Sequence, residues 1–326
     1  MGKFKILVSD SIAQEGIDEL RKHPEFDVII QTKHTKQELI NLIPPFHAVI
    51  VRSATTLDAE VLTAAKNLKV VARAGTGYDN IDVKECTKLG IVVMITPAGN
   101  SLAVAELTLG YMLDFARHIS NARQSMVEGR WDKNKFTGTE LAGKTIGILG
   151  LGRIGGLVAK RALAFDMNVI AYDKYITKDR AKEFAATLLD DFNEFLKKSD
   201  YICIHLPLTP ETTNMIDAPQ FEIMKPTSCI INIARGGIVN EKTLVTALKE
   251  GKIGGACIDV YSKEPASTNE YPFILLPNCI TTPHLGASTM EAQNKVGSLA
   301  ADQIAHALLE KKYIDAVNLK DIKTPR

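Results

Sequence analysis

The chain has 326 residues, which is enough for two domains or one large one with an ample core. Apolar residues make up 45% and charged residues 24% of the sequence, as in an ordinary globular protein. The formal net charge is only +1 and no long run of one sign occurs, which argues against a nucleic-acid-binding or membrane-surface protein.

The cysteines predict a reducing environment. They are scattered without a C-x-x-C spacing, and most lie in or beside apolar, strand-like runs: Cys86, Cys203, Cys229, Cys257 and Cys279. This pattern is typical of small core residues and not of a disulfide or metal-binding framework. No signal peptide precedes the first apolar run, and no run approaches membrane-spanning length. We therefore expect a cytoplasmic protein with no metal site, no membrane association and no nucleic-acid partner.

The first hundred residues alternate between strand-like and helix-like segments. Strands are expected at residues 4–8, 26–30, 48–51, 69–72 and 91–95. Helices are expected at residues 11–22, with Ser11 as N-cap, and at 36–42, 56–65 and 80–89. Such alternation predicts a compact α/β lobe built on a parallel sheet that is covered by helices on both faces.

Residues 96–100, TPAGN, interrupt this alternation and mark a boundary. Beyond them, residues 101–128 form one long amphipathic stretch that predicts a helix leading to Trp131, the only tryptophan. Lys133 and Lys135 follow it. We interpret them as a solvated charged loop, and the alternative is that they add positive charge to the site of a partner subunit.

Residues 144–173, KTIGILGLGRIGGLVAKRALAFDMNVIAYD, are the most informative stretch. A short apolar run at 145–149 predicts a buried strand, and glycines follow in G-x-G-x-x-G spacing at Gly150, Gly152 and Gly155. A helix is expected at 154–165 and a second strand at 168–172. In this arrangement the first glycine permits a tight turn, the second lets a pyrophosphate approach the backbone, and the third lets helix and strand pack closely. The order predicts dinucleotide binding, and the alternative is an ordinary tight turn.

Asp173 ends the second strand, 18 residues past the last glycine of the fingerprint. A carboxylate at this place accepts hydrogen bonds from the adenosine ribose hydroxyls and repels the 2′-phosphate of NADP, so NAD is the expected cofactor. Lys174 is adjacent and weakens this discrimination.

The remaining chain continues the alternation. Strands are expected at residues 201–206, 229–234, 256–260 and 279–282, and helices at 190–198, 218–224, 241–250, with Asn240 as N-cap, and 289–311. The last helix has no domain of its own to complete, so we expect it to return to the first lobe. The expected domains are therefore a substrate lobe at 1–98, a dinucleotide-binding domain at 99–287, and a return segment at 288–326.

Three charged side chains of the second half follow predicted strands: Arg235, Glu264 and His284. Ligands of open α/β sheets bind at this carboxyl edge. An arginine offers a planar fork for a carboxylate, a histidine exchanges a proton near neutral pH, and a carboxylate orients it and favours its charged form. Taken singly, a histidine at a strand end is more often a loop hydrogen-bonding residue than a proton carrier, and the alternative for Glu264, which precedes Pro265, is a turn residue.

Several motifs resemble the D-2-hydroxyacid dehydrogenase family: GLGRIG at 150–155, NIARGG at 232–237, DVYSKEP at 259–265 and TPHLGAST at 282–289. Segments of the front lobe, and the one before the fingerprint, are similar to the phosphoglycerate dehydrogenase branch: VRSAT at 51–55, RAGTGYDNID at 73–82, TPAGNS at 96–101 and GTELAGKTIGILGLGRIG at 138–155. The resemblance implies two doubly wound, parallel-sheet α/β lobes, with a Rossmann-type NAD domain inserted into a flavodoxin-like substrate lobe.

The resemblance also implies roles for single residues. Arg235 matches the arginine that grips the substrate carboxylate and polarises its C2 oxygen. His284 matches the acid/base, and Glu264 matches the carboxylate that pairs with it. Asp259 matches the residue near the nicotinamide carboxamide, and His205 is a positioning residue near the cofactor. The expected cofactor-binding residues are Thr76, Gly150, Gly152, Arg153, Ile154, Gly155, Asp173, Ala234, Asp259, His284 and Gly286.

The substrate contacts are expected mainly in the front lobe. Arg52 and Arg73 each follow a strand and suit a dianionic phosphate, and the alternative is that both are surface arginines. The backbone N–H groups of Ala74 and Gly75 are expected to hold the substrate carboxylate. The expected substrate-binding residues are Arg52, Ser53, Arg73, Ala74, Gly75, Arg235 and His284. A second phosphate loop at 75–77 is the rival interpretation, which Asn80 argues against because it stands where the fingerprint needs glycine.

The implied activity is NAD-dependent oxidation of a phosphorylated 2-hydroxy acid, 3-phospho-D-glycerate, to 3-phosphooxypyruvate, the entry step of serine biosynthesis. A homodimer formed through residues 101–128 is expected, and a C-terminal regulatory domain is not. The alternatives are a glyoxylate/hydroxypyruvate reductase or a broad D-2-hydroxyacid dehydrogenase and, from another class of protein, a non-catalytic NADH-sensing corepressor.

Overall fold

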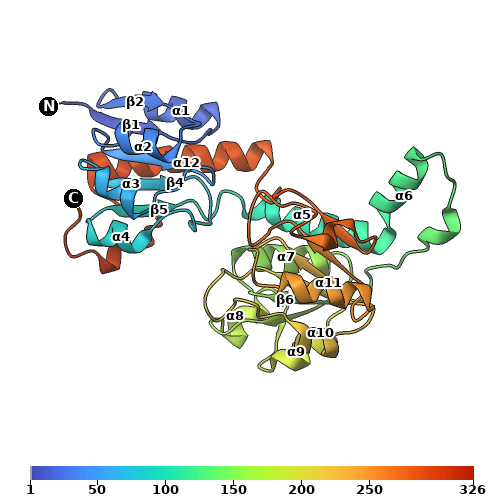
Figure 1. Cartoon of the computed structure of the whole chain (residues 1–326). Helices are drawn as coiled ribbons and strands as arrows, with labels where there is room; N and C mark the ends of the chain where they lie inside the picture. Colours follow the sequence, from blue (N-terminus) through green and yellow to red (C-terminus); the bar gives the residue numbers. More distant parts are fainter. Residues whose placement is uncertain (1) are drawn as a thin grey trace. The chain divides into compact units, whose positions relative to one another are not determined.

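The computed structural model describes residues 2–326 and divides into two compact units (Figure 1). Unit 1 comprises the chain up to Asn100 together with Ala287–Arg326, and unit 2 comprises Ser101–Gly286. Unit 2 therefore interrupts unit 1 in the sequence. The assignment of substrate binding to unit 1 and of dinucleotide binding to unit 2 stays a prediction at this stage.

Unit 1 is built on a five-stranded, all-parallel sheet with the order β2-β1-β3-β4-β5. This is the flavodoxin-like order, and its switch point lies between β1 and β3. The elements are β1 (Phe4–Val8), α1 (Gln14–Arg21), β2 (Phe26–Ile30), α2 (Lys36–Leu42), β3 (Ala48–Val51), α3 (Ala59–Ala64), β4 (Val70–Arg73), α4 (Val83–Lys88), β5 (Val92–Ile95), α12 (Met290–Glu310) and the 3₁₀ turn Leu319–Asp321.

Both faces of the unit 1 sheet are buried. Along β1, Ile6 and Val8 pack into a core shared with α1 and α12, whereas Leu7 points into the opposite core with Leu39 of α2 and Val61 of α3. Side chains of a strand alternate between faces, so the consecutive apolar residues Ile6, Leu7 and Val8 supply both cores at once. The apolar strands of the sequence thus agree with a sheet that is covered by helices on both faces.

The last helix, α12, belongs to unit 1. In Figure 1, α12 lies beside α1 and β4. It begins nearly 200 residues after β5, the last strand of this sheet. Gly16 and Gly297 make the approach of the two helices possible, since a Cβ atom at Gly16 would lie 2.7 Å from the Gly297 carbonyl. The C-terminal segment returns to β5, where Asn318 Oδ1 accepts a hydrogen bond from Val93 N (2.9 Å).

Unit 2 is built on a seven-stranded, all-parallel sheet with the order β12-β11-β10-β9-β6-β7-β8. Counted within the unit this is 7-6-5-4-1-2-3, the Rossmann order with one strand added at the edge. The elements are α5 (Ser101–Arg117), α6 (Ile119–Val127), β6 (Thr145–Leu149), α7 (Arg153–Leu163), β7 (Asn168–Tyr172), α8 (Lys178–Lys182), β8 (Thr187–Leu188), α9 (Phe192–Lys198), β9 (Tyr201–Ile204), α10 (Ala218–Ile223), β10 (Cys229–Asn232), α11 (Glu241–Lys249), β11 (Gly255–Ile258), β12 (Cys279–Thr281) and the 3₁₀ turns Lys133–Phe136 and Pro272–Leu275.

Two cores cover the faces of this sheet as well. Ile146 and Ile148 of β6 pack with α5 and α7, while Leu149 packs on the other face with the helices α9 to α11. The predicted fold class, two doubly wound parallel-sheet lobes, is thus confirmed. The prediction that the cysteines are unpaired core residues is confirmed too, because all five are buried and free.

Three local predictions were wrong or incomplete. Ser11 does not cap α1, whose N-cap is Ala13 without a side-chain hydrogen bond. The stretch 101–128 is two helices, because His118 adopts a left-handed conformation (φ 55°) and the Asp114 carboxylate accepts a hydrogen bond from Ser120 N (2.8 Å). The short elements α8 and β8 were not predicted.

The predicted N-cap Asn240 is confirmed: its Oδ1 atom accepts hydrogen bonds from Lys242 N (3.1 Å) and Thr243 N (3.4 Å). Asparagine therefore supplies the acceptor that the first turn of α11 requires. None of the helices between residues 2 and 326 is both long and apolar enough to cross a membrane.

Candidate active site

The candidate residues of unit 2 lie along one edge of its sheet. All seven strands are parallel, so the loops that follow them meet at the carboxyl edge, where open α/β sheets bind ligands. These loops carry the glycine fingerprint after β6, Asp173 after β7, His205 after β9, Arg235 after β10, Asp259 and Glu264 after β11, and His284 after β12.

Each of the three fingerprint positions has a different reason for being glycine. Gly150 has φ +96°, and a Cβ atom there would lie 2.8 Å from the His205 carbonyl oxygen. A Cβ atom at Gly155 would lie 2.3 Å from the Gly150 oxygen, so packing of α7 on β6 requires glycine. At Gly152, the N-cap of α7, a Cβ atom would meet no protein atom within 4 Å, and φ is −77°. The fold therefore does not demand a glycine here, and the open space beside Gly152 suits the predicted approach of a pyrophosphate to the N-terminus of α7.

Asp173 is joined to the fingerprint loop. Its Oδ2 atom accepts a hydrogen bond from Leu151 N (2.9 Å), and its Oδ1 atom accepts one from Tyr175 N (2.9 Å). A carboxylate has further lone pairs, so it can still accept bonds from ribose hydroxyls. The residues of the loop, with Arg153 and Ile154 opening α7, therefore fit a dinucleotide.

His284 and Glu264 form a pair. His284 Nδ1 lies 2.8 Å from Glu264 Oε2, and the two side chains are 46% and 37% exposed, so the imidazole is open to a substrate. Within residues 2–326 no hydrogen bond uses the Nε2 atom of His284. The backbone holds the pair from both sides, since Tyr261 N donates to Glu264 Oε1 (3.2 Å) and His284 N donates to the Asp259 carbonyl oxygen (2.9 Å).

Arg235 follows β10 in a tightly constrained turn. Asn232 Nδ2 donates to the Arg235 oxygen (2.8 Å), and Asn232 Oδ1 accepts from Ala234 N (3.1 Å). A Cβ atom at Gly236 would lie only 1.9 Å from the carbonyl carbon of Tyr261. The glycine after the arginine is therefore required by the crossing of this turn with the loop after β11, which also carries Glu264.

Asp259 is fully buried and organises the loop that carries His284. Its Oδ1 atom accepts hydrogen bonds from the Thr282 hydroxyl and from Leu285 N (2.6 Å), and its Oδ2 atom accepts one from Gly286 N (2.8 Å). Burial raises the pKa of Asp259, and these hydrogen bonds oppose the rise because they stabilise the charged form. Asp259 is predicted to lie near the cofactor, whereas its bonds to the loop could not be foreseen from the sequence.

Among residues 2–326, the ring of His205 has no hydrogen-bond partner. Both ring nitrogens are buried and lack a hydrogen bond within the described chain, and burial lowers the pKa of His205 to about 4. The imidazole is therefore neutral at physiological pH, which suits the predicted positioning role better than that of a proton carrier.

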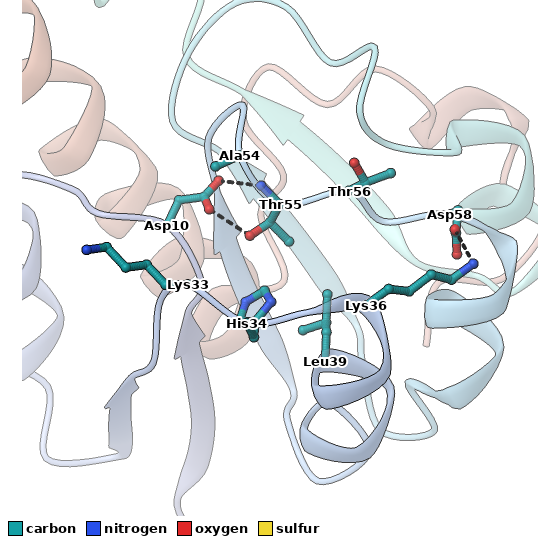
Figure 2. A pocket seen from close by; sticks show the side chains of 9 residues that line it. All are labelled: Asp10, Lys33, His34, Lys36, Leu39, Ala54, Thr55, Thr56 and Asp58. Carbon is teal, nitrogen blue, oxygen red and sulfur yellow. Dashed lines mark hydrogen bonds and ion pairs between the residues drawn. The ribbon is translucent and has the colours of Figure 1, made fainter. Parts of the chain in front are cut away.

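In unit 1, a buried carboxylate fixes the loop of Arg52. Asp10 Oδ2 accepts hydrogen bonds from Arg52 N (2.6 Å) and Thr55 N (3.1 Å), and Oδ1 accepts one from the Thr55 hydroxyl (2.6 Å); Figure 2 shows the two bonds to Thr55. Asn80 Nδ2 donates to the Arg52 oxygen (2.7 Å). Neither role was predicted from the sequence, although the position of Asp10 just after β1, at the carboxyl edge of the sheet, was a signal for the first.

A pocket of about 200 Å³ adjoins this network at the carboxyl ends of β1, β2 and β3 (Figure 2). His34 enters it from the loop after β2, and its Nε2 atom lies 2.6 Å from the buried Ser9 hydroxyl, which in turn contacts the Thr55 hydroxyl (2.9 Å). Lys36 and Asp58 form an ion pair (2.7 Å) on the opposite wall. The pocket thus lies beside the Arg52 loop at the switch point of the sheet.

The turn after β4 differs from the expectation. Ala74 N donates to the Val51 oxygen (2.9 Å) and Gly75 N donates to the Arg73 oxygen (2.8 Å), so both N–H groups that were expected to hold a substrate carboxylate have acceptors in the chain. A Cβ atom at Gly75 would lie 1.5 Å from Arg73 Nη1, so the arginine side chain folds over this glycine. The backbone N–H groups of Thr76 and Gly77, by contrast, donate no hydrogen bond within residues 2–326, so they remain available as donors.

The comparisons with known proteins agree with this geometry. The model of the D-isomer specific 2-hydroxyacid dehydrogenase NAD-binding domain matches residues 109–286. The chain is 46% identical over 320 residues to the D-3-phosphoglycerate dehydrogenase of Archaeoglobus fulgidus, covering 98% of this chain and 60% of that protein. It thus spans about three fifths of the length of that relative.

Two solved structures are similar over nearly their whole length. The glyoxylate reductase from Paecilomyes thermophila has a TM-score of 0.88 and 28% identity, covering 98% of this chain and 99% of that one. The NAD-dependent formate dehydrogenase from Staphylococcus aureus, in complex with NAD, has a TM-score of 0.84 and 29% identity, covering 96% and 97%. The chain belongs to the D-isomer specific 2-hydroxyacid dehydrogenase family and contains its NAD-binding domain.

Proposed function

We propose that the chain is an NAD-dependent dehydrogenase that oxidises 3-phospho-D-glycerate to 3-phosphooxypyruvate. The observation that carries the proposal is the contact of His284 with Glu264 on the same sheet edge as the glycine fingerprint. A hydroxy acid needs a proton acceptor when its C2 carbon is oxidised, and a paired imidazole is the usual one.

The residues divide this chemistry among them. NAD, held by the fingerprint loop and Asp173, supplies the hydride acceptor when bound. His284 takes the hydroxyl proton on Nε2. Its Nδ1 atom carries a proton toward Glu264, because an ionised carboxylate only accepts hydrogen bonds, and the glutamate stabilises the imidazolium that forms. General base catalysis of this kind contributes about 10²–10⁴-fold to the rate.

Arg235 binds the substrate carboxylate and polarises the C2 oxygen. A guanidinium presents parallel N–H donors that match a carboxylate, and it stays charged at every physiological pH. The turn from Asn232 to Gly236 fixes its backbone. Arg235 thereby orients the substrate, while proton transfer stays with His284.

The phosphate selects the substrate. Arg52 and Arg73 of unit 1 bind the phosphate, with Ser53 adjacent, and the name of the Archaeoglobus relative supports this choice. The unused N–H groups of Thr76 and Gly77 supply anion contacts in place of those of Ala74 and Gly75, which donate to backbone carbonyls. This reaction would begin serine biosynthesis.

A reductase of an unphosphorylated 2-oxo acid is the second candidate, favoured by the likeness to the glyoxylate reductase structure. The decisive experiment compares kcat/KM for 3-phospho-D-glycerate, D-glycerate and D-lactate with NAD, and for glyoxylate and hydroxypyruvate with NADH. A preference for the phosphorylated acid supports the proposal, and a preference for an unphosphorylated acid contradicts it. Binding of NADH without turnover of any of them would favour the corepressor.

A homodimer in the cytoplasm completes the proposal. In unit 2, α6 and the loop after it extend away from the sheet (Figure 1) and carry exposed apolar side chains: Ile119, Met126, Val127 and Trp131. Solvent-exposed apolar groups of this size, gathered on one projecting segment, are typical of a protein interface. The five free cysteines suit a reducing compartment.

A further inference from the structure

The loop that carries His284 is connected to α5 by hydroxyl groups. Tyr111 of α5 is almost fully buried, and its hydroxyl is hydrogen-bonded to the hydroxyl of Thr282. The Thr282 hydroxyl donates to Asp259 Oδ1, and the Tyr261 hydroxyl donates to the Thr282 carbonyl oxygen (3.1 Å). All of these residues belong to unit 2. No motif of the sequence pointed to Tyr111.

The direction of these hydrogen bonds follows from the number of protons. A threonine hydroxyl has one proton, and that of Thr282 goes to the carboxylate of Asp259, which only accepts when ionised. Tyr111 must therefore be the donor to Thr282. Burial raises the pKa of Tyr111, so its hydroxyl keeps the proton that it donates. The three residues form a one-way series from Tyr111 through Thr282 to Asp259.

Asp259 in turn binds the backbone of His284 and of the two residues after it. Its carboxylate accepts hydrogen bonds from Leu285 N (2.6 Å) and Gly286 N (2.8 Å), and its carbonyl oxygen accepts one from His284 N (2.9 Å). His284 itself has φ +55°, a conformation that non-glycine residues seldom adopt unless their surroundings hold them in it. The hydrogen bonds to Asp259 come from His284 itself and from the two residues that follow it.

We propose that Tyr111 and Thr282 are positioning residues for His284. They hold the Asp259 carboxylate in the rotamer that binds the Leu285 and Gly286 amides, and this fixes the left-handed backbone at His284 and the direction of its ring toward Glu264. The catalytic consequence rests on the proposed dehydrogenase function, whereas the order of the loop does not. Neither residue touches the reacting atoms.

Three substitutions and one control test the proposal. Thr282→Val removes the hydroxyl and keeps the shape, Thr282→Ser restores the hydroxyl, and Tyr111→Phe removes only the first donor. Tyr201→Phe is the matched control, because Tyr201 is a buried tyrosine of the same unit whose place at the start of β9 puts it at the opposite edge of the sheet. Steady-state kinetics with NAD and 3-phospho-D-glycerate measure kcat and both KM values for each variant.

We expect Thr282→Val to lower kcat by about tenfold or more and Tyr111→Phe by a few fold, with KM for NAD unchanged, because misplacing a catalytic group slows the chemical step. Thr282→Ser should restore most of kcat, and Tyr201→Phe should equal the wild type. A uniform loss of activity in all four variants would indicate general destabilisation and would overturn the proposal.

Amide hydrogen exchange supplies a readout that does not need turnover. Exchange at Leu285 and Gly286 should quicken in Thr282→Val and, to a smaller extent, in Tyr111→Phe, and remain at the wild-type rate in Tyr201→Phe. If the wild type does not oxidise any hydroxy acid, the proposed function fails and this exchange still decides the inference. Wild-type exchange in both variants would overturn the positioning role, whatever the activity.

Discussion

The Nδ1 atom of His284 lies 2.8 Å from Oε2 of Glu264, although 20 residues separate them in the sequence. They come from the loops after β12 and β11, which are neighbouring parallel strands. Parallel pairing brings the carboxyl ends of both strands to one place, so the contact follows from the fold. An acid/base pair at this position is what the proposed reaction requires.

Loss of the Glu264 charge should slow the chemical step. Glu264→Gln keeps a hydrogen-bond acceptor beside His284 but does not stabilise an imidazolium, so we expect kcat to fall about 10- to 100-fold, with the dissociation constant of NAD unchanged. Stopped-flow measurement of NADH formation and NAD titration by calorimetry test this. Glu270→Gln is the control, since Glu270 is an acid of the same loop that pairs with Lys263. Equal activity of the two variants would contradict the role of Glu264.

Arg52 should discriminate phosphorylated from unphosphorylated acids. Arg52→Ala removes one of the two proposed phosphate ligands, so KM for 3-phospho-D-glycerate should rise by about 10- to 100-fold, as expected for loss of a charged hydrogen bond, whereas KM for D-glycerate should change little. Arg21→Ala, at the exposed end of α1, is the control. Equal rises of KM for both acids would show that Arg52 does not bind the phosphate.

The cofactor preference should depend on Asp173. Asp173→Ala removes the negative charge that disfavours a 2′-phosphate, so the ratio of kcat/KM for NAD over that for NADP should fall by about tenfold or more. Part of the NAD affinity should be lost as well, because the carboxylate also holds Leu151 N of the fingerprint loop (2.9 Å). An unchanged ratio would contradict the proposed placement of the adenosine ribose.

The buried His205 should make unit 2 sensitive to acid. Burial lowers the pKa of His205 to about 4, below the ordinary value of 6.5, so between these values the unfolded chain binds more protons than the folded one. The free energy of unfolding should therefore decrease as the pH falls from 6.5 to 4, by at most about 3 kcal/mol. Above pH 6.5 this contribution is constant.

Urea unfolding in a pH series measures this effect. His205→Phe, which keeps a flat ring without the titrating nitrogens, should lose much of the dependence of the midpoint on pH between 6.5 and 4. His23→Gln, a substitution in unit 1, should keep the wild-type slope. Identical slopes for wild type and His205→Phe would contradict the neutral, buried state of the ring.

The projecting segment around α6 should be the dimer interface. Val127 is 62% and Trp131 80% exposed, so a charge placed among them should oppose association. We expect sedimentation equilibrium to show a dimer for the wild type and monomers for Val127→Glu. Leu275→Glu, at another exposed apolar side chain, should remain dimeric. A monomeric wild type would contradict the proposed homodimer.

The sequence was most informative where a local pattern determined the structure. The strands Phe4–Val8, Phe26–Ile30, Ala48–Val51, Thr145–Leu149 and Asn168–Tyr172 coincide with the predicted ranges, because apolar runs between turn residues leave little choice of boundary. The glycine spacing likewise indicated the turn that Gly150 and Gly155 make. The family motifs indicated both residues of the His284–Glu264 pair. The two residues are in contact because they lie in the loops that follow the adjacent strands β12 and β11.

The parts that escaped prediction depend on contacts between distant segments. Tyr111 lies in the middle of a helix, and nothing near it in the sequence shows that its hydroxyl meets Thr282, 171 residues later. The break at His118 depends on Asp114, whose carboxylate accepts a hydrogen bond from Ser120 N in the first turn of the next helix. The N–H groups of Ala74 and Gly75 looked available because their backbone acceptors are set by the turn and by the neighbouring strand.

The transfer of deuterium from C2 of the substrate tests the central claim most directly. Purified protein is incubated with NAD and 3-phospho-D-glycerate labelled with deuterium at C2, and the nicotinamide of the product NADH is examined by NMR. We expect the wild type to place the label on C4 of the nicotinamide and His284→Ala to form this product at least about 100 times more slowly. Unlabelled NADH, no NADH, or equal rates in the two proteins would contradict it.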